Sequence, residues 1–230
     1  MSDNNSPVFS LIHPSRGRCQ MAIETAKLWA ANADNPKQIQ YILSLDNDES
    51  ELTCYKNNFI RTNNLFKEVI FSVSGNKNVV QAANAGAKYA TGGIFVLLSD
   101  DFSCPENWDS FILENIDIEK EEALAVNDGL QPTTKTILTL PIMTKLLYQH
   151  LSYIYYPEYS GIKADDDLAQ TCLAMNCLRI NKSKTFQHLH WVNKKKERDE
   201  TNNRHDNPEG WELGNRIFQQ RKSINFGIVK

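Results

Sequence analysis

Two adjacent carboxylates at the end of an apolar run are the residues most suggestive of chemistry. Residues 94–98 are entirely apolar and lead directly into Ser99, Asp100 and Asp101. Carboxylates at the end of a buried strand are costly unless a cation lies beside them. Mg²⁺ or Mn²⁺, held by one carboxylate and shared with the phosphates of a substrate, would meet that need, whereas a solvated acidic loop is the alternative.

Two later segments could complete such a site. Residues 186–191 alternate in polarity as a strand does, so His188 and His190 are expected to face the same way, and imidazole is a usual ligand of Mn²⁺-type ions. Residues 165–167 are three aspartates that open an expected helix, where capping accounts for one or two carboxylates. Single histidines are more often structural, but this pair shares a face, and three carboxylates exceed what capping requires.

The first two apolar runs are also followed by polar groups. Arg16 and Arg18 follow the first run and could meet a diphosphate with forked donors, although an ordinary turn before a helix is the alternative. Asp46 and Asp48 follow the second run and could bind a base imide or a ribose hydroxyl, with helix capping by Asp48 as the alternative. The candidate substrate-binding residues are Pro14, Ser15, Arg16, Arg18, Asp46, Asp48, Asn76, Asn84, Ser99 and Asp100.

The elements that must position these residues alternate along the chain. Short apolar runs followed by longer helical patterns predict an α/β fold, a mostly parallel sheet flanked by helices on both faces. Ligands of such sheets lie beyond the carboxyl ends of the strands, which is where the candidates fall. Asn76 is the expected N-cap of the third helix. The expected strands are 8–12, 39–45, 69–73, 94–98 and 123–126, and the expected helices are 17–33, 49–61, 77–90, 105–116, 141–151, 165–175 and 208–220.

Length and composition narrow the class of protein. The chain has 230 residues, 41% hydrophobic and 23% charged, which is typical of one globular domain with a sizeable core. The formal net charge is −3, so the overall charge gives no sign of a general nucleic-acid binder. The tyrosine-rich stretch 153–159 could line a binding wall or cover the core, and the polar run 193–207 is expected to be a mobile loop.

The cysteines and the first residues bear on the cellular compartment. Five cysteines without a C-x-x-C pair suggest neither a disulfide framework nor a zinc ribbon, so reduced, buried thiols are expected. The first residues are polar and lack the features of a signal peptide, and no apolar run is long enough for a membrane span. These observations predict a cytoplasmic protein.

The order of these motifs resembles that of the GT-A glycosyltransferases, most closely the family 2-like group. The resemblance is carried by Pro-Ser-Arg-Gly-Arg at 14–18, Asp46, Ala-Asn-Ala-Gly at 83–86, Ser-Asp-Asp at 99–101, Asp-Asp-Asp-Leu at 165–168, and His-x-His at 188–190. It implies a GT-A, Rossmann-like nucleotide-diphospho-sugar transferase fold over 1–230 as a single domain. Residues 8–115 would form the nucleotide-sugar-binding half, 116–192 the acceptor and catalytic half, and 193–230 a mobile loop and C-terminal helix.

The resemblance also implies roles for individual residues. Residues 14–16 and Asp46 would contact the nucleoside, and Asn84 and Asp100 would lie near the ribose and the donor sugar. Asp101 would bind the metal together with His188 or His190. Asp165 would be the general base, with Asp167 as the second catalytic candidate of the same motif. The sequence departs from the family pattern at Ser99, where the family has an Asp, and at Ala164, where the family has a Glu.

These inferences lead to one expected function and two alternatives. The expected function is a metal-dependent glycosyltransferase that uses Mn²⁺ or Mg²⁺ and moves a sugar from a nucleoside diphosphate donor, a UDP-sugar, to an acceptor hydroxyl with inversion. The acceptor could be a glycan, a lipid, a protein or a nucleic-acid base. A nucleotidyltransferase would usually begin with a glycine-rich loop, but Gly17 is the one glycine in the first loop. A non-catalytic sugar-nucleotide or glycan-binding module is the other alternative.

Overall fold

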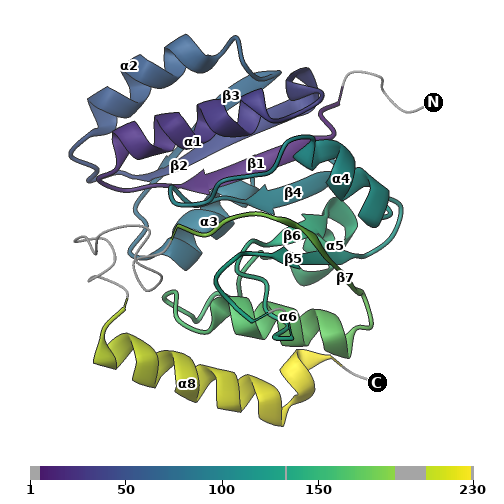
Figure 1. Cartoon of the computed structure of the whole chain (residues 1–230). Coiled ribbons are helices and arrows are strands. Elements are labelled where there is room, and N and C mark those ends of the chain that lie inside the picture. Colours follow the sequence, from purple (N-terminus) through teal and green to yellow (C-terminus); the bar gives the residue numbers. More distant parts are fainter. Residues whose placement is uncertain (1–5, 133, 190–205, 229–230) are drawn as a thin grey trace.

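The molecule is built on a seven-stranded sheet with strand order β3-β2-β1-β4-β6-β5-β7. The computed structural model describes residues 6–132, 134–189 and 206–228 (Figure 1). Neighbouring strands run parallel except on both sides of β6, so the expected mostly parallel α/β fold is confirmed. The strands are β1 (Phe9–Pro14), β2 (Ile39–Asp46), β3 (Glu68–Ser74), β4 (Ile94–Leu97), β5 (Ala123–Asn127), β6 (Ile142–Thr144) and β7 (Leu178–Thr185).

Helices cover both faces of this sheet (Figure 1). Among the described residues, no helix combines the length and the apolar character needed to cross a bilayer. The α-helices are α1 (Cys19–Ala31), α2 (Leu52–Thr62), α3 (Val79–Ala87), α4 (Trp108–Asn115), α5 (Lys145–Leu151), α6 (Ala164–Ala174) and α8 (Pro208–Ser223), with short 3₁₀ turns at Pro36–Gln38 and Asn225–Gly227.

The alternation of side chains along each strand produces two hydrophobic cores. In β4, Ile94 and Val96 pack under α1, α2 and α4, while Phe95 and Leu97 pack against α3, α5 and α6 on the opposite face. The first core is aromatic, and the Trp29 and Trp108 rings lie 4.9 Å apart, edge to face. Because both faces are covered, β4 is apolar throughout, as the sequence pattern predicts.

Several elements differ from the sequence prediction. The expected helix 141–151 is a short strand, β6, followed by α5. The edge strand β7 was not predicted. In the described part of the strand-like segment, residues 186–189, Phe102 and His188 form an isolated bridge. The N-cap of α3 is Asn78, whose side chain accepts from the Gln81 amide at 2.9 Å, and not Asn76.

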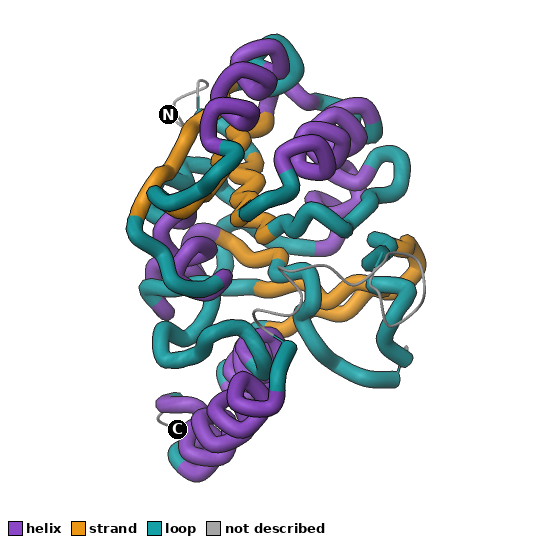
Figure 2. The backbone as a smooth tube through the Cα atoms, turned by 90° about the vertical axis from the view of Figure 1, so that its left-hand side faces the viewer, coloured by secondary structure: helices purple, strands orange, loops and turns teal. Residues whose placement is uncertain are grey.

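A buried ion pair attaches the C-terminal helix to the rest of the fold. Arg221 of α8 donates to Asp167 of α6 through Nε, 3.0 Å from Oδ2, and through a terminal nitrogen, 3.2 Å from Oδ1. The guanidinium also lies over the Tyr156 ring, 4.0 Å from its centroid. A Cβ at Gly214 would lie 2.5 Å from the Ile162 carbonyl, so the close approach of α8 requires a glycine there. As a result, α6 and α8 lie together at the lower end of the molecule (Figures 1 and 2).

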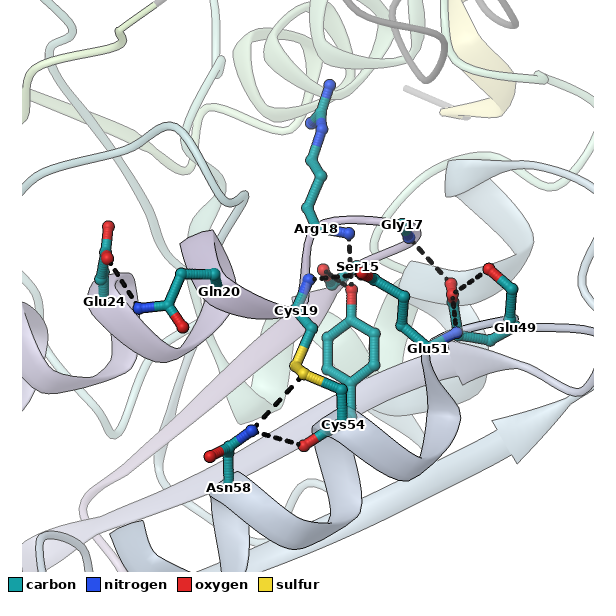
Figure 3. The surroundings of a disulfide bond; sticks show 12 residues. Ser15, Gly17, Arg18, Cys19, Gln20, Glu24, Glu49, Glu51, Cys54 and Asn58 are labelled. Atoms are coloured by element: carbon teal, nitrogen blue, oxygen red, sulfur yellow. Dashed lines mark hydrogen bonds between the residues drawn. A yellow bond between two sulfur atoms is a disulfide. The ribbon is translucent and has the colours of Figure 1, made fainter.

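One pair of cysteines contradicts the expectation of reduced thiols. Cys19, the first residue of α1, forms a disulfide with Cys54 of α2 (Figure 3). The two helices pack side by side on one face of the sheet, which brings together two residues whose sequence spacing suggests no pairing. The other cysteines are buried free thiols, at positions 104, 172 and 177.

We expect the disulfide to contribute measurably to stability. It joins residues 35 apart, and loop-closure entropy predicts a contribution of about 3–4 kcal/mol, or roughly 6–16 °C in the melting temperature. Dithiothreitol should therefore lower the melting temperature of the native protein, measured by circular dichroism. The double variant Cys19→Ser, Cys54→Ser is the control, because reductant should not shift its melting temperature further. Equal melting temperatures with and without reductant would contradict the prediction.

Candidate functional site

A cavity of about 660 Å³ opens beyond the carboxyl ends of β1, β2 and β4. Its opposite wall comes from the loop between β5 and β6, the N-terminus of α6 and the start of α8. The structure thus brings most of the sequence candidates to one place, as expected for a ligand site of an open parallel sheet. The candidates that line it are Pro14, Ser15, Arg16, Arg18, Asp46, Ser99, Asp100, Asp101, Asp165 and His188.

Asp100 lines the cavity and is held there by hydrogen bonds to residues of β1 and the loop after it. Its Oδ1 lies 3.0 Å from Nε2 of the fully buried His13 and accepts from the Ser15 hydroxyl at 2.7 Å. A carboxylate can only accept here, so Nε2 carries the proton and Nδ1 accepts a short hydrogen bond from the Tyr41 hydroxyl. Burial, with the charge of Asp100, raises the pKa of Tyr41 well above its usual value and keeps that hydroxyl a donor. Asp100 therefore joins the end of β1 to the loop after β4, and it is linked to Tyr41 of β2 through His13.

The loop after β1 carries two arginines, and each is held by different carboxylates. Arg16 donates to Asp46 at 2.6 Å and to Asp48 at 2.5 Å. Arg18 lies 3.7 Å from Oδ2 of Asp100. In Figure 3 the Arg18 side chain extends away from the disulfide, and the backbone of the loop is held by Glu49, which accepts from the Gly17 amide at 2.9 Å. These carboxylates orient the guanidinium groups of Arg16 and Arg18, which both line the cavity.

Asp101 and His188 form the candidate metal pair. Nε2 of His188 lies 3.6 Å from Oδ1 of Asp101, and the Ser99 hydroxyl donates a short hydrogen bond to the same carboxylate. The His188 ring stacks on Phe102 with 4.3 Å between centroids. One carboxylate and one imidazole this close can coordinate the same divalent ion. Within the described residues no group of three or more His, Cys, Asp or Glu side chains that could hold a metal ion is found. His190, the other predicted histidine ligand, lies outside these residues.

The three aspartates at the start of α6 have three different environments. Asp165 lines the cavity, and its burial, reinforced by the nearby charge of Asp166, raises its pKa to about 6. Asp166 accepts from Lys163 at 2.8 Å. Asp167, expected to be catalytic, is 1% exposed, lies outside the cavity lining and binds Arg221. Helical spacing explains the difference, because successive side chains point about 100° apart around the axis. This buried, ion-paired position favours a structural role for Asp167 over the predicted catalytic one.

Three predicted substrate contacts also lie outside the cavity lining. Asn84 donates to the Tyr155 carbonyl at 2.7 Å and accepts from the Ile154 amide at 2.9 Å, so it holds the tyrosine-rich stretch against α3. Asn76 donates to the Leu45 carbonyl at 3.3 Å. Asp48 is exposed and pairs with Arg16. In these positions each side chain supports a wall of the cavity from outside, and contact with a substrate stays a prediction for all three.

Several other lining residues carry little or no sequence motif. Gln131, Lys135 and Thr139 belong to the loop between β5 and β6, which has no motif, and Lys163 precedes α6. Trp211 lines the cavity from the first turn of α8 and stays 47% exposed. Tyr155 both lines the cavity and is buried, so the tyrosine-rich stretch supplies a wall and core cover together.

Comparisons with known proteins support the fold. No protein-family model and no curated protein sequence matches the chain. Among solved structures, TarS of S. aureus in complex with UDP-GlcNAc superimposes with a TM-score of 0.70 at 14% identity, covering 91% of this chain and 65% of that one. The mannosyltransferase PcManGT of Pyrobaculum calidifontis, in complex with GDP-Man and Mn²⁺, gives 0.62 at 12% identity, covering 95% and 76%.

These similarities show the fold that the chain shares with these proteins. A longer TarS structure gives a TM-score of 0.63 at 13% identity, and this chain covers 36% of its length. The chain thus spans 36% of that TarS chain, 65% of the shorter TarS chain and 76% of the mannosyltransferase chain. The expected GT-A glycosyltransferase fold is confirmed.

The raised pKa of Asp165 predicts a stability cost. Because its folded pKa of about 6 exceeds that of an unfolded carboxyl, the folded state binds more protons between about pH 4 and 6, and stability falls as pH rises through that window. Asp165→Asn should therefore raise the free energy of unfolding by about 1–3 kcal/mol at about pH 7.5, and by much less at about pH 4. Urea unfolding at both pH values measures the difference, and equal stability of variant and wild type at the higher pH would contradict it.

Proposed function

We propose that the chain is a metal-dependent glycosyltransferase that moves a sugar from a nucleoside diphosphate donor to an acceptor hydroxyl. The observation that carries the proposal is the cavity itself, which gathers two arginines, an Asp101–His188 pair and the half-buried Asp165 on facing walls. The shared fold supports it, since the matched TarS structure holds UDP-GlcNAc and the matched mannosyltransferase holds GDP-Man and Mn²⁺.

The loop after β1 would bind the donor. Arg16 and Arg18 offer forked donors that suit a diphosphate, and Asp46 can accept from a base or a ribose hydroxyl once Arg16 turns to the phosphates. The Arg18 side chain is already held near Asp100, with 3.7 Å between the guanidinium and the carboxylate. It therefore loses little freedom when a diphosphate binds. We assign a UDP-sugar as the donor class to be tested first.

Asp101 and His188 would hold the metal. When bound, Mn²⁺ or Mg²⁺ would neutralise charge that develops on the leaving diphosphate. Ser99 replaces an expected Asp, and its hydroxyl donates to the Asp101 carboxylate and so orients it. The departure from the family pattern is therefore compatible with metal binding at Asp101.

Asp165 would take the proton of the acceptor hydroxyl. A carboxyl with a pKa of about 6 is ionised at neutral pH and is a stronger base than an ordinary aspartate. The acceptor oxygen would bond to the anomeric carbon as the bond to the diphosphate oxygen breaks, with its proton passing to Asp165. Attack from the face opposite the leaving group would invert the anomeric centre.

Metal-dependent nucleotide binding tests the donor half of the proposal. Mn²⁺ should tighten UDP binding by at least about tenfold, about 1.4 kcal/mol, measured by isothermal titration with GDP as the comparison nucleotide. Asp101→Asn should abolish the effect of the metal. Asp117→Asn, which removes an exposed carboxylate outside the cavity, is the matched control and should behave like the wild type. Absence of nucleotide binding by the wild type would refute the donor site.

Replacing Asp165 tests the chemical half. Asp165→Asn should lower kcat by at least about a hundredfold and leave the Kd for UDP nearly unchanged, because the amide cannot accept the proton. The wild-type kcat/KM should rise with pH as Asp165 ionises, reach half its maximum near pH 6, and level off about one pH unit higher. Donor hydrolysis and transfer can be followed by release of UDP. Transfer by the variant at a near wild-type rate would remove the assignment, and donor binding without any turnover by the wild type would favour a binding module.

A further inference from the structure

We propose that Asp128 is a positioning residue for this site, because it anchors both the loop between β5 and β6 and the segment that carries His188. The proposal rests on the function proposed above, in which His188 is a metal ligand. Asp128 follows the last residue of β5 and is not itself part of the cavity lining. It is 4% exposed, so its carboxylate serves the interior of the protein.

The Asp128 carboxylate closes the base of the loop with three hydrogen bonds. Oδ1 accepts from the amides of Leu130 at 2.9 Å and Gln131 at 2.8 Å. Oδ2 accepts from the hydroxyl of Thr139, at the far end of the loop, at 2.7 Å. All three donors are neutral, and together they satisfy a carboxylate that would be costly to bury without partners.

The loop that is closed in this way is a wall of the cavity. Between its two anchored ends it contributes Leu130, Gln131, Lys135, Ile137 and Thr139 to the lining. A loop that is pinned at its base keeps its side chains in place with less loss of freedom when a ligand binds. The Asp128 side chain thus determines where this wall stands.

The backbone of the same residue holds the His188 segment. The Asp128 carbonyl accepts from the His188 amide at 2.8 Å, and the preceding Asn127 carbonyl accepts from Phe186 at 2.8 Å. On the other side, the Leu189 amide donates to the Asp101 carbonyl at 2.7 Å. The His188 segment therefore lies between the end of β5 and Asp101, and the orientation of the imidazole depends on the backbone at position 128.

A second buried aspartate provides a comparison within the same chain. Asp109 is 3% exposed and accepts from the backbone amides of Asp34 and Asn35, each at 2.9 Å. It performs the same structural task, holding a loop through backbone hydrogen bonds, but neither it nor its partners line the cavity. A variant at Asp109 should therefore lose stability without any effect on the site.

The experiment compares Asp128→Ala, Asp128→Asn and Asp109→Ala in the full chain. Hydrogen exchange read by mass spectrometry should be faster in Asp128→Ala, by at least about tenfold, over both 130–139 and 186–189. The Kd for UDP in the presence of Mn²⁺ should rise by about ten- to a hundredfold. Asp109→Ala should lower the melting temperature as much as Asp128→Ala does. It should change neither the exchange over 130–139 and 186–189 nor the Kd for UDP.

Asp128→Asn should restore both readouts to near the wild-type values. Its Oδ1 can keep the two backbone bonds while the amide donates to the Thr139 hydroxyl, which can accept as well as donate. If Asp128→Ala does not fold, Thr139→Val, which removes one of the three bonds, should show the same pattern more weakly.

Two results would overturn the proposal. One is faster exchange over 130–139 with no change over 186–189, since the two segments would then be independent. The other is equal weakening of UDP binding by Asp128→Ala and Asp109→Ala, since the effect would then be general instability. The exchange measurement needs no ligand, so it decides the anchoring even if the wild type binds no nucleotide, a result that would instead refute the proposed function.

Discussion

The site depends first on the need to satisfy the buried carboxylate of Asp100. This group stands at the end of an apolar strand, and leaving it without partners would cost several kcal/mol, on the order of 3–5 kcal/mol for an uncompensated buried charge. His13 and Ser15 supply the partners, and both come from the strand and loop beside it. The Ser15 hydroxyl also contacts the hydroxyl of Tyr55 of α2. Asp100 and Tyr55 together therefore hold the loop that carries the two arginines.

Asp165 is the opposite case, since its environment disfavours the charged form that the proposed reaction needs. The first turn of α6 tolerates this because its neighbours carry the stabilising contacts. Asp167 is held by Arg221, Tyr159 and Thr171, and it ties α6 to α8. A single turn of helix thus places a destabilised carboxylate toward the cavity and a fully paired one toward the core.

The sequence predicts the central strands and the main cavity residues because these follow one local rule, an apolar run ending in polar groups. It does not predict β7, whose outer position in the sheet leaves it exposed and polar, with no apolar run to mark it. It also cannot separate Asp165 from Asp167, or a ligand contact from a brace at Asn84, because the direction of each side chain is set by packing. The Cys19–Cys54 bond arises in the same way, from two helices that meet only in the folded chain.

The supports of the candidate site are divided between the two hydrophobic cores. Cys19 and Tyr55, which hold the loop after β1, belong to the core under α1, α2 and α4, whereas the α6 turn with Asp165 belongs to the core on the other face. The sheet lies between these two cores, and Asp100 and Asp128 lie just beyond the last residues of its strands β4 and β5. Buried carboxylates at strand ends are costly wherever they occur. In this fold each of them holds a loop that lines the cavity, and such a fixed geometry would serve the proposed reaction between a donor and an acceptor.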